Sequence, residues 1–300
     1  MNKIHRRVAF LVMCFFSLLL LASLPTAKTD RAGLVISVSG EVTVSHGKGP
    51  ERVTEGYALQ EGDTVVVKMG AKCSGFGLGG EPFRLTGPAR LILTSSTEGG
   101  ARNIAGWIAD QVAQWSGRSR SKELVSRGIR DRYRTIQAPA PLIPADDGRV
   151  RVSSSSFCWM TVEGVDQYKV TIAPVAGDES HYTVRGHEFT LDDLQPGAEY
   201  VWKVSADVGT ARMSSRWSSF RVMTPEEEQQ VEEAQSALSD LEAGVMLAAV
   251  GLHEEAISRL DAAVDSDTTR QPALFWRAKV FASIGLYKEA YDDITEATGR

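Results

Sequence analysis

The chain has 300 residues, a formal net charge of −5 and an apolar fraction of 43%. This length exceeds what one compact core usually holds, so a single small domain is excluded and we expect two or three. The apolar fraction is ordinary for a globular protein. The net charge by itself says little, but its distribution along the chain is informative.

Two stretches carry opposite charge. Residues 225–300 hold sixteen Asp and Glu against six Lys and Arg, a net charge of −10. The basic run that begins at Arg118 and ends at Arg134 has seven basic and two acidic residues, a net charge of +5. The two stretches could dock on each other, recruit separate partners of opposite charge, or simply be solvated faces.

The amino terminus has the pattern of an export signal. Arg6 and Arg7 precede an apolar run over residues 8–24, and small residues follow up to Ala27. We expect residues 1–27 to be either a cleaved secretory signal or an uncleaved membrane anchor, because the run is near the length that spans a bilayer. Either way, the rest of the chain crosses the membrane.

Residues 33–95 have the pattern of a small all-β domain. Apolar and polar residues alternate over 35–44, 64–67 and 90–93, and glycine-bearing turns separate these runs. Alternation with a period of two, interrupted by turn residues, predicts short strands with one buried face each. No helix fits this segment.

Residues 38–44, 56–65 and 83–91 resemble the FecR-type periplasmic domain. The resemblance implies a β domain whose core includes Leu59 and Val65, in the periplasm or cell envelope of a bacterium. Members named for iron-citrate regulation transmit a surface signal to a cytoplasmic anti-sigma segment. Only a few residues precede the apolar run here, so the domain type carries over and the iron role does not.

Residues 96–147 are expected to connect two domains. Residues 103–115 place two tryptophans on one apolar helical stripe, either dipping into a membrane surface or capping the open end of the β domain. The basic run 118–134 could contact an anionic cell-wall polymer. It lacks the interleaved aromatics that stack on bases, so we expect no nucleic acid. A proline-rich stretch over 138–144 then predicts an extended linker.

Strand patterns return over residues 148–223, with aromatic and apolar residues alternating at 157–159, 168–172 and 200–204. Residues 194–200 resemble the tyrosine corner of fibronectin type III domains, which implies a β-sandwich of about seven strands. The residues that would carry this motif and its early-strand core tryptophan are Leu194, Pro196, Gly197, Tyr200 and Trp159.

Residues 225–300 are expected to be helical. Thr224, Pro225 and Glu227 form the start signal of a helix, with a capping box and a proline in the first turn, and one long helix could run to about Val250. A short phrase at 251–256 then returns at 285–290, which is thirty-four residues later.

That period and its small residues resemble the tetratricopeptide repeat, which is a stack of helix pairs. The resemblance implies a concave groove that binds peptide segments, here of an envelope protein. Two repeats are few, so the acidic helix that begins at Pro225 must cap one end or a partner must cover the other. The positions that match the repeat are Gly244, Gly251, Ala256, Leu260, Ala263, Ala278, Phe281, Gly285, Ala290, Ile294 and Ala297.

Two cysteines, Cys73 and Cys158, fall in different expected domains. We expect two separate, partly buried thiols, with a disulfide as the alternative.

No group of residues has the spacing of a catalytic or metal site. His46, His181, His187 and His253 lack metal-ligand spacing, and neither a nucleophile motif nor a phosphate-binding glycine loop is present. We therefore expect no catalytic residues, no metal and no cofactor, and a structural His253.

The sequence as a whole indicates a non-enzymatic, exported cell-envelope protein that binds or scaffolds partners. Two alternatives stay open, a FecR-type signalling protein and a cell-wall polymer-binding protein. Contact with a membrane is expected only through the amino-terminal segment, if it is not cleaved.

Overall fold

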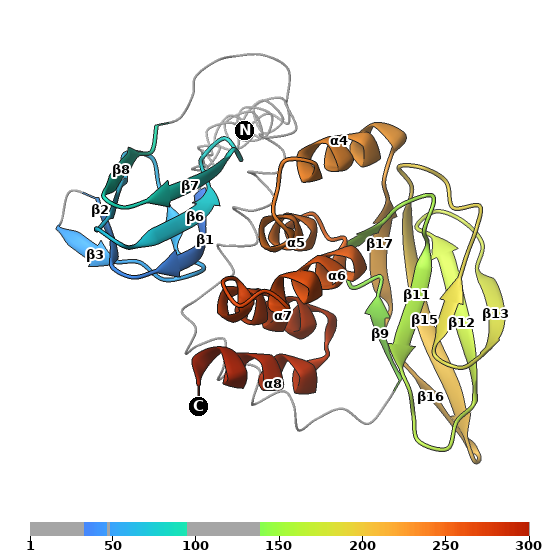
Figure 1. The fold of residues 1–300 in the computed structure, drawn as a ribbon. Coiled ribbons are helices and arrows are strands. Elements are labelled where there is room, and N and C mark those ends of the chain that lie inside the picture. The colour runs from blue at the N-terminus through green and yellow to red at the C-terminus, as the bar shows by residue number, and fades with distance from the viewer. Residues whose placement is uncertain (1–32, 47–48, 95–138, 300) are drawn as a thin grey trace, which may run out of the picture. The chain divides into compact units, whose positions relative to one another are not determined.

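The computed structural model describes residues 33–46, 49–94 and 139–299. Within these ranges it has two β-rich parts followed by a helical part, so the chain is multidomain, as the sequence indicated (Figure 1). The expected export segment 1–27, the tryptophan-bearing helix 103–115 and the basic run 118–134 lie outside the described residues.

The first β part consists of two four-stranded antiparallel sheets. One sheet has the order β4-β1-β6-β7 and the other the order β3-β2-β5-β8. The strands are β1 Gly33–Ser39, β2 Val42–Ser45, β3 Pro50–Arg52, β4 Ala58–Leu59, β5 Thr64–Val67, β6 Lys72–Phe76, β7 Pro82–Thr86 and β8 Ala89–Ile92.

The expectation of one buried face per strand is wrong for β1. Leu59 and Val65 are fully buried in the core of the β part, together with Val35 of β1. Leu34 and Ile36, on the opposite face of β1, are also fully buried, but in a separate cluster that includes helical residues. Successive side chains of a strand point to opposite faces, so β1 lies between two cores.

The second β part is a sandwich of two sheets. One has the order β14-β11-β9, and the other contains the path β10-β17-β15-β12-β13 with β16 paired to β15. The strands are β9 Ala140–Ile143, β10 Gly148–Val150, β11 Ser156–Met160, β12 Gln167–Pro174, β13 Ser180–Arg185, β14 Glu188–Thr190, β15 Glu199–Val208, β16 Ala211–Ser214 and β17 Ser218–Val222.

Aromatic side chains fill the core between these sheets. Trp159 on β11 is buried, as is Trp202 on β15. The rings of Phe157 and Trp202 form a T-shaped pair with centroids 5.2 Å apart, and the Trp202 indole donates a hydrogen bond to the Pro144 carbonyl at 3.0 Å. Such edge contacts suit the charge distribution of aromatic rings, so the rings in this core are buried in preferred relative orientations.

The tyrosine corner takes the geometry that its sequence implies. The backbone N–H of Gln195 donates to the Tyr200 hydroxyl at 3.1 Å, and Leu194 is buried in the sandwich core. Gly197 has φ of +76°, which a residue with a side chain rarely adopts. Pro196 and Gly197 form the turn that leads the chain into β15.

Five helices follow within the described residues, and one long helix up to Val250 is not among them. The chain breaks that expected helix because Ser239 and Glu242 form a second capping box, which starts a new helix. The helices are α4 Pro225–Gln235, α5 Asp240–Ala249, α6 His253–Val264, α7 Arg270–Ile284 and α8 Tyr287–Thr298.

Helices α5 and α6 form one hairpin and α7 and α8 form another, with α6 packed on α7. Gly251 and Gly285 have φ near +90° and lie in the turn of each hairpin. Phe281 is half-buried. The other positions expected from the resemblance are buried, and they are Gly244, Ala256, Leu260, Ala263, Ala278, Ala290, Ile294 and Ala297.

We predict that Gly244→Ala destabilises the chain although alanine favours helices. An added Cβ would lie 2.6 Å from Cγ of Leu260 and 3.2 Å from the carbonyl of Ala256. Overpacking of about 1–3 kcal/mol should outweigh a helix gain of about 1 kcal/mol. Urea unfolding measures this. In a Leu260→Ala variant the side chain that meets the added Cβ is gone, so Gly244→Ala should raise the free energy of unfolding there. If Gly244→Ala lowers it in that variant too, the steric explanation is wrong.

Candidate functional site

The inner helices α5 and α7 are covered by the first β part. Leu34, Ile36 and Phe76 belong to the same buried apolar cluster as Val245 and Trp276. The Trp276 indole donates a hydrogen bond to the Ile36 carbonyl at 2.9 Å, and this contact is buried. The expectation of a groove open to another macromolecule is therefore wrong for this face of the helix pairs.

The composition of α5 explains this burial. Every residue from Leu241 to Ala248 is buried, and apart from Glu242 all of them are apolar or glycine. A helix that is apolar all round must be covered on every side, because exposed apolar surface is unfavourable in water. Helix α6 covers one side of α5, and the sheet β4-β1-β6-β7 covers another.

Glu242 is the polar exception in this buried layer. Its side chain is 2% exposed and receives hydrogen bonds from both Arg84 on β7 and Ser239. Burial raises the pKa of Glu242, but the bonds from Arg84 and Ser239 outweigh it and hold the pKa below the ordinary value. The carboxylate therefore stays charged and connects the helices to the first β part.

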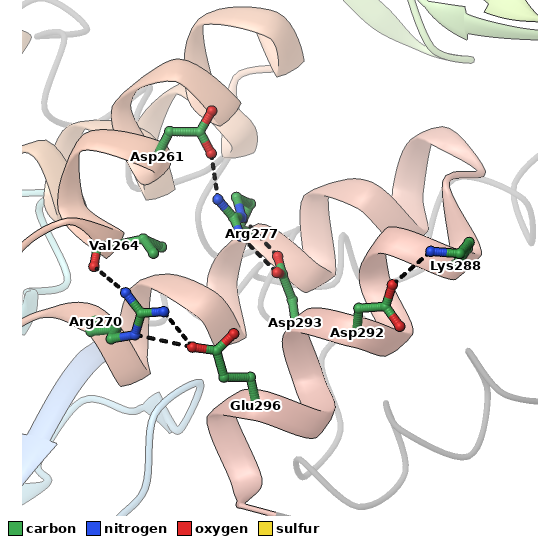
Figure 2. Close-up of polar contacts among 8 residues, drawn as sticks. All are labelled: Asp261, Val264, Arg270, Arg277, Lys288, Asp292, Asp293 and Glu296. Carbon is green, nitrogen blue, oxygen red and sulfur yellow. Dashed lines mark hydrogen bonds and ion pairs between the residues drawn. The ribbon is translucent and has the colours of Figure 1, made fainter.

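A second ionic cluster joins helices α6, α7 and α8 (Figure 2). Arg277 on α7 binds both oxygens of Asp293 on α8 at 2.7 Å and an oxygen of Asp261 on α6 at 2.6 Å. Burial raises the pKa of Asp293, and Arg277 opposes that shift. Nearby, Arg270 binds Glu296 and donates to the Val264 carbonyl at 3.3 Å. Arg277 thus links three successive helices, α6, α7 and α8.

The sandwich meets the start of α6 through backbone and ionic contacts. The backbone N–H of Arg149 donates to the Gly251 carbonyl at 3.0 Å, and an added Cβ at Gly251 would lie 3.1 Å from that nitrogen. Arg151 forms two hydrogen bonds with Glu255, at 2.6 and 2.9 Å. Gly251 therefore serves close approach between domains as well as the hairpin turn.

Between the sandwich and α6 lies a cavity of about 340 Å³. Sequence reasoning missed it, because its walls come from β9, β10, β11, β14 and α6, which are far apart in the chain. His253, the first residue of α6, lines the cavity and is half-buried. Burial lowers the pKa of His253 to about 4, so the ring is neutral near pH 7.

We predict that His253 makes the protein sensitive to acid. Its pKa is lower in the folded chain than its ordinary value of 6.5, so the unfolded chain binds more protons between these values. The free energy of unfolding should therefore be highest above pH 6.5 and fall as the pH approaches 4. Since the ring is half-buried, we expect the effect to be on the order of 1–2 kcal/mol.

Chemical unfolding at pH 7 and pH 4.5 measures this effect. The difference between the two pH values should be smaller for His253→Gln than for the unchanged chain, because glutamine does not titrate. Other groups near the ring, namely Arg149, Arg151, Glu254 and Glu255, are present in both proteins and act as an internal control. Identical pH dependence in both proteins would show that His253 is not the sensor.

Cys73 and Cys158 are both free thiols, so the disulfide alternative does not hold. Burial raises the pKa of Cys73 to about 12 and that of Cys158 to about 11. Both therefore stay protonated near neutral pH and are poor nucleophiles.

No three His, Cys, Asp or Glu side chains gather to hold a metal ion within residues 33–46, 49–94 and 139–299. In the same described ranges, no helix combines the length and the apolar character needed to cross a bilayer.

Comparison with known proteins gives partial similarities. No family model matches the chain. Tenascin-R of Rattus norvegicus and of Mus musculus is 36% identical over 81 residues, and tenascin-R of Homo sapiens is 37% identical over the same length. Each match covers 25% of this chain and 6% of the relative, so the chain spans a small fraction of the length of the curated relatives it matches.

Two solved structures are also similar. A fibronectin type III domain from human KIAA0970 protein has a TM-score of 0.23 and 17% identity, covering 36% of this chain and 86% of that one. A two-domain fibronectin type III segment from chicken tenascin has a TM-score of 0.21 and 15% identity, covering 67% and 87%. With its sheet order and its Tyr200 hydrogen bond, the sandwich of residues 140–222 is fibronectin type III-like in fold.

Proposed function

We propose that the chain is a non-enzymatic scaffold and binding protein of the bacterial cell envelope. In this proposal the first β part is a FecR-like domain, and the helix pairs are tetratricopeptide-like repeats. The resemblances of residues 38–44 and 56–65, and of the phrase at 251–256 and 285–290, support these assignments. The export pattern of residues 1–27 supports the location.

One observation carries the proposal. The helical layer is held to both β parts, through Trp276 and Glu242 on one side and through Gly251 and Glu255 on the other. In this arrangement the repeats act as an internal connector that orients two β parts. Partners then bind to surfaces that remain exposed, and the closed inner face is not the binding site.

The exposed surfaces differ in character. The outer side of α8 carries exposed charged residues, among them Glu289 and Asp292. On the sandwich, the ammonium of Lys203 lies 4.0 Å from the ring centre of Trp217, whose side chain is partly exposed. We assign the envelope-protein partner to these surfaces. An anionic cell-wall polymer is assigned to the basic run 118–134.

Site-specific photo-crosslinking in cells tests where partners bind. A crosslinking residue at Glu289 or at Trp217 should capture an envelope protein. The same residue at Lys279, whose ammonium lies 4.5 Å from the ring centre of Trp276, should give crosslinks within the chain. Capture of an external protein from position 279, with none from 217 or 289, would contradict the proposal.

A further inference from the structure

The cavity between the sandwich and α6 combines an apolar floor with a polar rim. Ile143, Val150 and Leu252 contribute apolar side chains, and Thr190 and Ser258 contribute exposed hydroxyl groups. Its volume of about 340 Å³ lies at the lower end of the range of small-molecule sites, and such sites often form between domains. The cavity therefore has the size and position of a site for a small ligand.

Charged side chains that line the cavity already have partners, and Arg149 donates to the Val250 carbonyl at 3.4 Å. Arg151 is held by Glu255, and Glu254 accepts a hydrogen bond from the Ser156 hydroxyl. A charged ligand would lose its water and find no unengaged counter-charge in these pairs. An anion at the start of α6 would also lie beside the carboxylates of Glu254 and Glu255. Both points favour an uncharged ligand.

The remaining polar groups can both donate and accept hydrogen bonds. The neutral His253 ring has one donor and one acceptor nitrogen, and it makes no hydrogen bond to any described residue. The side-chain hydroxyls of Thr190 and Ser258 likewise make no hydrogen bond within the described part of the chain. Hydroxyl groups of a ligand match this set, because they also donate and accept.

We propose that this cavity binds a small uncharged molecule rich in hydroxyl groups, of the size of one sugar ring. The apolar floor packs against the C–H face of the ring, and His253, Thr190 and Ser258 bind its hydroxyls. This site is separate from the macromolecular surfaces of the proposed function.

Titration of the full chain, labelled in its histidine rings, tests the proposal by NMR. The probes are glucose, N-acetylglucosamine and glycerol, with inorganic phosphate as the charged comparison, and His253→Gln assigns the His253 signals. At least one neutral probe should shift these signals in a saturable way, with a dissociation constant of about 1 mM. Inorganic phosphate should cause no saturable shift of these signals.

Matched variants place the binding in the cavity. Ser258→Trp should fill the cavity and weaken binding at least about tenfold. Ser283→Trp, at an exposed serine of α7 that does not line the cavity, should leave affinity unchanged. If Ser258→Trp does not fold, Thr190→Val, which removes one rim hydroxyl, should weaken binding. No saturable shift with any neutral probe, shifts with phosphate alone, or binding that survives these changes would overturn the proposal.

Discussion

Replacing Trp276 with alanine is expected to lower the free energy of unfolding by about 3–5 kcal/mol, the range for large aromatic side chains in a core. The side chain is fully buried, it meets the ring of Phe275 edge-on with centroids 5.2 Å apart, and its indole binds the Ile36 carbonyl. Alanine would leave a cavity and would strand that buried carbonyl. Urea or thermal unfolding of the full chain measures the loss.

Trp217→Ala provides the matched control. This tryptophan lies on the surface of the sandwich and is 42% exposed, so its loss should cost less than about 1 kcal/mol. Trp276→Ala should also make the first β part more susceptible to proteolysis, since it weakens the packing of β1 on α7. Equal, small effects of the two substitutions would mean that Trp276 is not a core residue.

Replacing Arg277 with methionine should be the second large effect. Methionine keeps much of the apolar stem but leaves the carboxylate of Asp293, whose side chain is 9% exposed, without its cation. Breaking a buried ion pair on one side costs about 3–5 kcal/mol. Because burial already raises the pKa of Asp293, losing Arg277 should raise it further, and the penalty should shrink as the pH falls and the acid becomes neutral.

Two comparisons make this prediction specific. Lys288→Ala removes an exposed ion pair with Asp292, one turn apart on α8, and it should cost no more than about 0.5 kcal/mol (Figure 2). Arg277→Met combined with Asp293→Leu removes both charges and should recover most of the lost stability. If the double variant is as unstable as Arg277→Met, the loss comes from packing and not from the stranded carboxylate.

The sandwich could be predicted from sequence because its signals are local. Alternating aromatics place Trp159 and Tyr200 in the core without knowledge of distant segments. The tyrosine corner lies within seven residues, 194–200, and its hydrogen bond spans only five positions. Turn and strand signals of this kind act between near neighbours, so a sequence reading can find them.

The boundary between α4 and α5 is also marked by a local signal. Ser239 and Glu242 have the spacing of a capping box, the same pattern that marks Thr224 and Glu227 as a start. Two helix-start signals within one stretch of helical apolar spacing indicate two helices. The same capping-box pattern at both places therefore separates α4 from α5.

The closed inner face could not be located from sequence, although one sign of it was visible. The run from Leu241 to Ala248 is apolar on all sides of α5, which requires a cover. What supplies the cover depends on contacts such as that between Trp276 and Ile36, which are 240 residues apart. The cavity beside His253 has the same origin, because it is formed by the packing of two domains.

The central claim is that the inner face of the helix pairs is a buried junction with the first β part. Hydrogen exchange of the Trp276 indole N–H, followed by NMR in the full chain and assigned with Trp276→Phe, tests it most directly. The claim predicts exchange on the order of a thousandfold slower than in a free indole, because the bond to Ile36 must open first. Exchange as fast as that of the exposed Trp217 indole would contradict it.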